Sequence, residues 1–282
     1  MSEVSARVSA VGGLWFFLAF FVLACSPGNA HEFWVEPQAV GPVKTGVTVA
    51  AHVRVGDHLA GQMLPYLPNI MKQMTHWGPD GQKKISAILG DRPAIGALSI
   101  GARGLHRITV ETHPSVTTFD TMADFTAYLD YEGLSGIAAE HRARGLAENA
   151  IVEAFTRNAK ALVQAGPVLP DHSDGPAGMP FEVVALDNPF AEAAQTADFE
   201  LLWQGVPVAG WHLSAFHLPA GGSPPADTVR TVLLTDATGK ITLDVSRGGR
   251  YLLNAVRLDP ANGPEGAVWT SHWASLSFIL SR

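Results

Sequence analysis

The chain has 282 residues, of which 47% are hydrophobic and 16% are charged, and its formal net charge is −7 at pH 7. This length allows two modest domains with a buried core, and the composition is typical of a globular protein rather than a disordered one. The negative charge gives no indication of a nucleic-acid-binding surface.

The first thirty residues resemble an export signal. Residues 14–25 (LWFFLAFFVLAC) form an apolar run of twelve residues, which is shorter than the roughly 20 residues that span a bilayer but typical of a secretory signal. Small residues at Gly28 and Ala30 predict cleavage before His31, and therefore a periplasmic protein. Two alternatives stay open, namely lipidation of Cys25 at a weak lipobox and a retained anchor helix. Cleavage at Ala30 leaves a mature chain without cysteine, and hence without disulfides.

Residues 31–116 are predicted to form an N-terminal β-domain. The stretches GVTVAAHVRVG (46–56) and LHRITVETH (105–113) alternate between apolar and polar residues, as half-buried strands do. Between them lies a long segment that is rich in turn residues and has no clean period. It contains a favourable turn at Pro79–Gly81 (PDG).

Residues 117–166 are predicted to be a helical segment. In TTFDTMADFTAYLDYEGL (117–134) the apolar residues recur at helical spacing. A second helix is predicted over AENAIVEAFTRNAKALVQAG (147–166), and residues 140–145 are expected to link the two. On this second helix Glu153, Arg157 and Lys160 share one face. They form either a surface charge ladder or, if the helix lies between two β-domains, a buried polar clamp.

The rest of the chain is predicted to be a linker loop (167–180) and a C-terminal β-sandwich (181–282). The sandwich is indicated by about seven short strands, namely FEVVAL, DFELLW, WHLSAFHL, TVRTVLLT, KITLDV, RYLLNAVRL and WASLSFIL. The predicted fold class is therefore mainly β, with two Ig-like or transthyretin-like sandwich domains and a helical segment between them.

His31 is the first candidate for a metal ligand, because cleavage would give it a free α-amine beside its imidazole. These two nitrogens can form a chelate ring on Ni²⁺, Co²⁺ or Cu²⁺, and the α-amine loses its proton near pH 8. One further histidine would complete a site with three nitrogen donors. The alternative is that processing exposes this histidine by accident.

His58 and His76, in the irregular segment, are predicted to be solvated surface residues.

Signatures of catalysis are mostly missing from the sequence. Its single cysteine lies in the predicted signal, GxSxG and HExxH do not occur, and no Gly-rich phosphate loop follows a strand. We therefore predict no enzyme, no catalytic residue and no organic cofactor.

Several stretches, taken in order, resemble a known family. They are AHEFWVEP, VRVGD, FTAYLDYEGL, the spaced residues Glu153, Arg157 and Lys160–Val163, GVPVAG, LTDATGKITLDV, GRYLLNAVRL and SHWASLSF. Together they resemble a family of bacterial exported proteins, domain of unknown function 4198, which is often described as similar to the periplasmic component of nickel or cobalt uptake systems. The resemblance covers residues 31–281 and implies β-sandwiches flanking a helical segment. It also implies a C-terminal part similar to the transthyretin-like or carboxypeptidase-regulatory sandwich.

The resemblance implies an exported metal-binding accessory protein that delivers Ni²⁺ or Co²⁺, or Cu²⁺, to an inner-membrane transporter. His31 is the ligand that it supports, with Glu32 as an oxygen donor; His52 and then His113 are candidates for a further ligand because they lie on neighbouring predicted strands. Membrane contact is expected only through the signal or a lipid anchor at Cys25. One alternative is a non-metal cell-envelope module that binds a protein or glycan. Another is a copper enzyme that activates dioxygen at a histidine brace.

Overall fold

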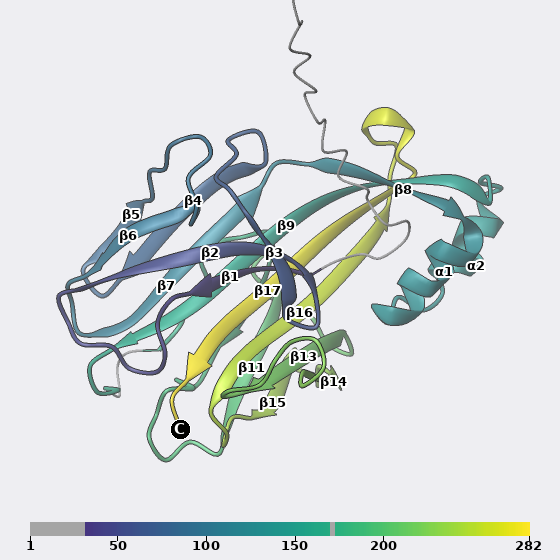
Figure 1. Cartoon of the computed structure of the whole chain (residues 1–282). Coiled ribbons are helices and arrows are strands. Elements are labelled where there is room, and N and C mark those ends of the chain that lie inside the picture. The colour runs from purple at the N-terminus through teal and green to yellow at the C-terminus, as the bar shows by residue number, and fades with distance from the viewer. Residues whose placement is uncertain (1–31, 170–172) are drawn as a thin grey trace, which may run out of the picture.

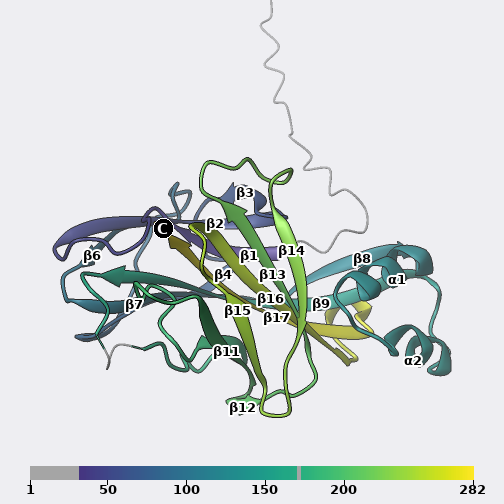
Figure 2. The same cartoon turned by 90° about the horizontal axis from the view of Figure 1, so that it is seen from below.

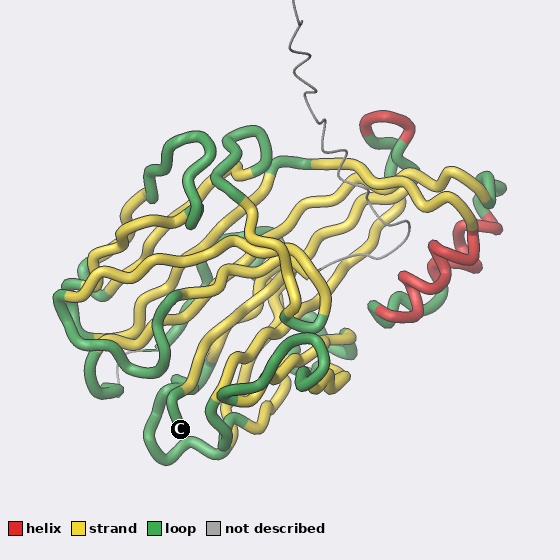
Figure 3. The backbone as a smooth tube through the Cα atoms, in the orientation of Figure 1, coloured by secondary structure: helices red, strands yellow, loops and turns green. Residues whose placement is uncertain are grey.

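A computed structural model describes residues 32–169 and 173–282. Strands dominate it, and the two α-helices are short (Figure 3). The prediction of a mainly β fold with sandwich-like sheets is confirmed. The predicted signal and its cleavage site lie outside the described residues. Within the described ranges, no helix has the length and apolar character that crossing a bilayer requires.

One nine-stranded sheet runs through the molecule (Figure 1). Its strands, in spatial order, are β14 (Val229–Leu234), β13 (His212–Pro219), β16 (Gly249–Pro260), β17 (Trp269–Leu280), β9 (Asn149–Ala165), β7 (Gly104–Thr112), β4 (Met71–Gly78) and β5 (Gly81–Lys84), with β8 (Ser115–Thr121) also paired to β9. The β9–β17 pair is parallel. Because β9 pairs with β7 of the predicted N-terminal domain on one side and with β17 of the predicted C-terminal domain on the other, both halves of the chain share a single sheet.

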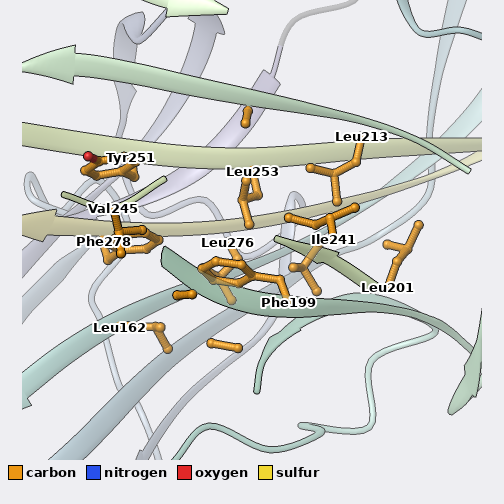
Figure 4. Close-up of a cluster of buried hydrophobic side chains, with 14 of the residues drawn as sticks. Leu162, Phe199, Leu201, Leu213, Ile241, Val245, Tyr251, Leu253, Leu276 and Phe278 are labelled. Atoms are coloured by element: carbon orange, nitrogen blue, oxygen red, sulfur yellow. The ribbon is translucent and has the colours of Figure 1, made fainter. Parts of the chain in front are cut away.

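Two smaller sheets cover opposite faces of the large one (Figure 2). One contains β1 (Glu32–Pro37), β2 (Val47–Asp57), β3 (Ala60–Leu64) and β6 (Ile95–Ile100); the other contains β10 (Phe181–Ala185), β11 (Thr196–Trp203), β12 (Val206–Pro207) and β15 (Lys240–Asp244). Alternate residues of β9 face opposite ways. Ala159 and Val163 pack with Phe33 of the first sheet, whereas Leu162 packs with Phe199 of the second (Figure 4).

The helices α1 (Met122–Tyr131) and α2 (Ile137–Ala143) pack at one end of the large sheet, and a 3₁₀ turn (Pro264–Gly266) lies before β17. A capping box formed by Thr121 and Asp124 starts α1. The buried side of α1 contacts a cluster that includes Trp269 and Trp273. The first helix was predicted, but it begins at Met122, and residues 117–121, predicted to be helical, belong to the strand β8. Residues 140–143, predicted as part of a link, belong to α2 instead.

The prediction of a second helix over 147–166 is wrong, because this segment is the strand β9. Alanine, lysine, glutamate and glutamine favour helices, and the strand shows no apolar–polar alternation because sheets cover both of its faces. Of the three charged residues of β9, Glu153 and Lys160 are buried and Arg157 is partly buried, so they do not form the surface charge ladder. Their arrangement differs from a helix, since Glu153 and Arg157 face the β1 side, whereas Lys160 faces the β10 side.

Candidate functional site

A group of polar side chains meets where β1, the β2–β3 turn, the end of α1 and β14 come together. We call it the junction cluster; its members are Glu32, Asp57, His58, Tyr131, Glu132 and Arg230. In the antiparallel register of β1 and β2, Glu32 lies opposite Gly56, so that Asp57 is close to it. The Tyr131 hydroxyl donates to Asp57 Oδ1 at 3.0 Å and lies 3.3 Å from Glu32 Oε1. Tyr131 therefore links the helix to the two strands.

The end of α1 is held against the C-terminal half of the chain. Gly133 follows the helix with a φ of 68°, and a Cβ at this position would lie 1.7 Å from His212 Nδ1. Only glycine permits both the left-handed backbone and this close approach. Arg230 completes the contact, because its guanidinium lies 3.8 Å from the centre of the Tyr131 ring and donates to Ser214 Oγ at 2.8 Å. The cluster is thus assembled from segments far apart in the sequence.

The β2–β3 turn presents His58 in an unfavourable backbone conformation. Asp57 pairs with Ala60, so the loop has two residues, and both take positive φ values, 50° at His58 and 60° at Leu59. Such turns favour Asn-Gly, and other residues are strained in them. Leu59 is buried against Trp34, which fixes the turn. His58 Nδ1 lies 2.6 Å from Asp57 Oδ1, so that Nε2 keeps its lone pair when His58 is neutral.

Replacing His58 with asparagine is expected to stabilise the protein. Asparagine tolerates positive φ better than most residues, so the melting temperature should rise by up to roughly 2–4 °C, which corresponds to about 1 kcal/mol in a domain of this size. Thermal melting of the variant beside the wild type measures the effect. A variant that melts no higher than the wild type would show that the turn is not strained at His58.

Two buried carboxyls of the junction cluster, those of Glu32 and Glu132, have raised pKa values. Burial, together with the nearby Asp57 carboxylate, raises the pKa of Glu32 to about 8. Burial and the charge of Glu32 likewise raise the pKa of Glu132 well above its usual range, although Arg230 opposes this shift. Glu32 Oε2 and Glu132 Oε1 are buried without a hydrogen-bond partner in the described part of the chain. Such atoms are costly to bury without a hydrogen-bond partner.

A second polar group continues from the junction cluster along β9. Ser271 donates a hydrogen bond to Glu153 Oε1, and the Trp273 indole donates to Ser271 Oγ at 3.0 Å. The Arg157 guanidinium lies 4.5 Å from the centre of the Phe155 ring and 5.7 Å from that of Trp273. Burial raises the pKa of Glu153 to about 7, although Ser271 and Arg157 oppose the shift.

The raised pKa of Glu153 predicts that the metal-free protein loses stability as the pH rises. Between about 4.5, its ordinary pKa, and about 7 the folded state keeps a proton that the unfolded state releases. The unfolded state binds fewer protons in this window, so the free energy of unfolding falls with increasing pH, by about 1.4 kcal/mol per pH unit for this group. Urea unfolding at pH 5 and 6.5 should show a difference that shrinks in Glu153→Gln. An equal difference in both proteins would disprove the assignment.

The structure places the predicted metal ligands as follows. His31 lies outside the described residues, and Glu32 is in the junction cluster. His52 pairs with Glu36, four positions and therefore about 13 Å along the strand from Gly56, and its ring contacts Gln38. His113 is exposed beyond the end of β7. Glu32 and Asp57 are therefore linked through Tyr131, and His58 contacts Asp57, whereas His52 lies away from them. The described residues alone contain no group of three His, Cys, Asp or Glu side chains that could hold a metal ion.

Sequence reasoning missed most of the junction cluster, yet a signal for it was available. Five of the stretches that carried the family resemblance contribute residues here. Three supply members of the junction cluster: AHEFWVEP (Glu32), VRVGD (Asp57) and FTAYLDYEGL (Tyr131 and Glu132). Two supply the polar group along β9, namely the Glu153–Arg157 spacing and SHWASLSF (Ser271). Motifs scattered over the chain thus meet at one place in the fold. This convergence favours the cluster as the functional site.

Comparisons with known proteins give a family but no activity. The model of the family described as "Domain of unknown function (DUF4198)" matches residues 28–259. Comparison with curated proteins gave no match. Among solved structures, the chicken CNTN1 FN1–FN3 domains are 9% identical with a TM-score of 0.21, and 89% of this chain covers 65% of that one. The Parabacteroides merdae β-glucuronidase is 11% identical with a TM-score of 0.18, and 89% of this chain covers 25% of that one. Likenesses this weak support no statement about fold or function.

Proposed function

The chain belongs to the family of the domain of unknown function DUF4198, and we propose that it is an exported, non-enzymatic protein that binds Ni²⁺ or Co²⁺ at its processed terminus. In this proposal the periplasmic protein delivers the ion to an inner-membrane transporter, and Cu²⁺ is a third ion that the same donors accept. The observation that carries the proposal is the burial of Glu32, with an unpartnered oxygen, directly beside the residue that cleavage would make the terminus.

The proposed donors complement one another. His31 supplies the α-amine and the imidazole Nδ1, and Glu32 supplies the oxygen that has no partner among the described residues. In this proposal His58 replaces His52 as the further ligand. Its Nδ1 faces the Asp57 carboxylate, an arrangement that orients histidine ligands and makes Nε2 a better donor. Three nitrogens and one carboxylate oxygen suit nickel, cobalt and copper.

The proposal is tested by nickel titration of protein that a bacterial host has exported and processed from the full chain. His31→Ala keeps the amine but loses the chelate ring, so the dissociation constant should rise by about 10–100-fold, which corresponds to about 1.4–2.8 kcal/mol. His113→Ala is the matched control, because His113 is exposed and lies outside the junction cluster. Equal affinities of the wild type and His31→Ala would rule out the proposed site.

A further inference from the structure

A cavity of about 590 Å³ lies between β5, the end strand of the large sheet, and β6 of the first small sheet (Figure 1). Residues of β4, β5 and β6 and of the loop between β5 and β6 line it. Cavities of about 300–1,000 Å³ commonly bind small organic molecules. The cavity is separate from the junction cluster, because no member of that cluster lines it.

The charged residues of the cavity favour an anionic ligand. Its lining contains Lys83 and Lys84 but only one carboxylate, that of Asp91. Asp91 Oδ2 is engaged, because it accepts a hydrogen bond from the Ile88 backbone at 2.7 Å. Lys83 pairs with Asp80 at 3.3 Å, but both side chains are exposed and such a pair is weak. Lys84 has no ion-pair partner in the described ranges.

The imidazole of His76, which also lines the cavity, adds no charge to it. His76 is buried, although the sequence predicted a solvated residue. His106 Nε2 donates to the Ala102 carbonyl oxygen at 2.8 Å, so its Nδ1 accepts from His76 Nε2 at 3.0 Å. Burial and the neighbouring His106 lower the pKa of His76. His76 is therefore neutral near pH 7, and the positive charge of the cavity comes from its two lysines.

Apolar side chains form another part of the lining. Ile85 and Leu98 line the cavity and are buried, and Ile88 lies at its rim. Ile88 and Leu89 are 76% and 69% exposed, the highest values among the large apolar residues that the structure describes. A turn fixes them, because the Asp91 backbone N–H donates to the Ile88 carbonyl oxygen at 2.9 Å. Apolar side chains held in water beside a cavity indicate a ligand with an apolar part.

We propose that this cavity binds a small amphiphilic carboxylate, whose charged end contacts Lys83 and Lys84 and whose apolar part packs against Ile85, Ile88 and Leu98. Lysine ammonium groups form charge-assisted hydrogen bonds with carboxylates. The apolar residues lose their contact with water when the ligand covers them. The inference does not rest on the proposed function, because no described member of the proposed metal site lines the cavity.

The test titrates the exported protein, kept in a chelator, with octanoate and with octylammonium in a calorimeter. The two probes have the same alkyl chain and opposite charges. Octanoate should bind with a dissociation constant below about 1 mM, and at least about tenfold more tightly than octylammonium. Lys83→Met combined with Lys84→Met should weaken octanoate binding at least about tenfold. Lys72→Met is the matched control and should change nothing, because Lys72 is exposed on β4 and does not line the cavity.

A second pair of variants tests the apolar part of the site. Ile88→Asn should weaken octanoate binding about fivefold, because the alkyl chain loses an apolar partner. Leu234→Asn, at an exposed residue of β14, should leave the affinity unchanged. All four replacements are at exposed positions, so equal melting temperatures would confirm that each variant is folded.

Four results would each overturn the inference: no octanoate binding up to about 10 mM, equal affinity for octylammonium, an affinity that the lysine replacements leave unchanged, or one that Ile88→Asn leaves unchanged. Binding to phosphatidylglycerol vesicles without any binding of octanoate would also overturn it, and would assign the exposed turn to a membrane surface instead. Since the titration contains no free metal, its failure leaves the nickel proposal standing, and the reverse also holds.

Discussion

Replacing Lys160 with methionine is expected to lower the free energy of unfolding by about 3–5 kcal/mol. The Lys160 side chain is fully buried, and its Nζ lies 3.1 Å from Asp174 Oδ2 and 3.2 Å from Glu182 Oε2. Both carboxylates are buried as well. Methionine fills a similar volume but removes the cation, so that two buried negative charges lose their main partner. The loss of stability comes from these stranded carboxylates rather than from a cavity.

Urea unfolding of Lys160→Met measures the effect, with Lys83→Met as the matched control. Lys83 forms an exposed ion pair with Asp80, at 3.3 Å, and exposed pairs contribute little to stability. Adding Asp174→Asn and Glu182→Gln to Lys160→Met should recover part of the loss, because neutral amides are less costly to bury than carboxylates. If Lys160→Met alone were as stable as the wild type, the ion pairs of Lys160 with Asp174 and Glu182 would not stabilise the fold.

Adding one residue in front of His31 is expected to weaken nickel binding by at least about 100-fold, equivalent to about 2.8 kcal/mol. The added residue converts the amine of His31 into an amide, and an amide nitrogen must lose a proton to bind a metal. It also breaks the chelate ring between the terminal amine and the imidazole. This loss should exceed that of His31→Ala, which keeps a free amine beside Glu32.

The glycine insertion between Ala30 and His31 provides this protein, and competition against a chromogenic chelator measures its affinity. An insertion elsewhere in an exposed loop is the control; the turn at Pro264–Gly266, which has no buried residue, is suitable because it lies away from the junction cluster. Nickel affinity equal to that of the wild type would show that the terminal amine is not a ligand.

Sequence reasoning found most strands of the two sandwich regions. β2 and β7 lie within one residue of the predicted ends, and the seven expected C-terminal strands are all present. β9 was missed although other strands with both faces buried, such as β10, were found. It differs in its many alanine, glutamate, lysine and glutamine residues, which favour helices. Nor does the sequence reveal that β9 pairs in parallel with β17, the pairing that merges the two predicted sandwiches. Such long-range pairing depends on packing rather than on a local pattern.

The candidate site was only partly predictable for the same reason. Glu32 could be chosen because it follows the expected cleavage site, but its neighbours depend on the register of β1 with β2. Tyr131 reaches Glu32 from 99 residues away, and Arg230 reaches Tyr131 across another 99. His58 looked like a surface residue in an irregular segment, because a two-residue turn with His-Leu instead of Asn-Gly has no recognisable turn signature.

Native mass spectrometry of protein exported by a bacterial host and exposed to one equivalent of Ni²⁺ tests whether processing creates a metal site at His31. The expected mass is that of residues 31–282 plus one nickel ion. A chain that begins at Cys25 or Met1, or one that begins at His31 and carries no nickel, would show that no such site forms.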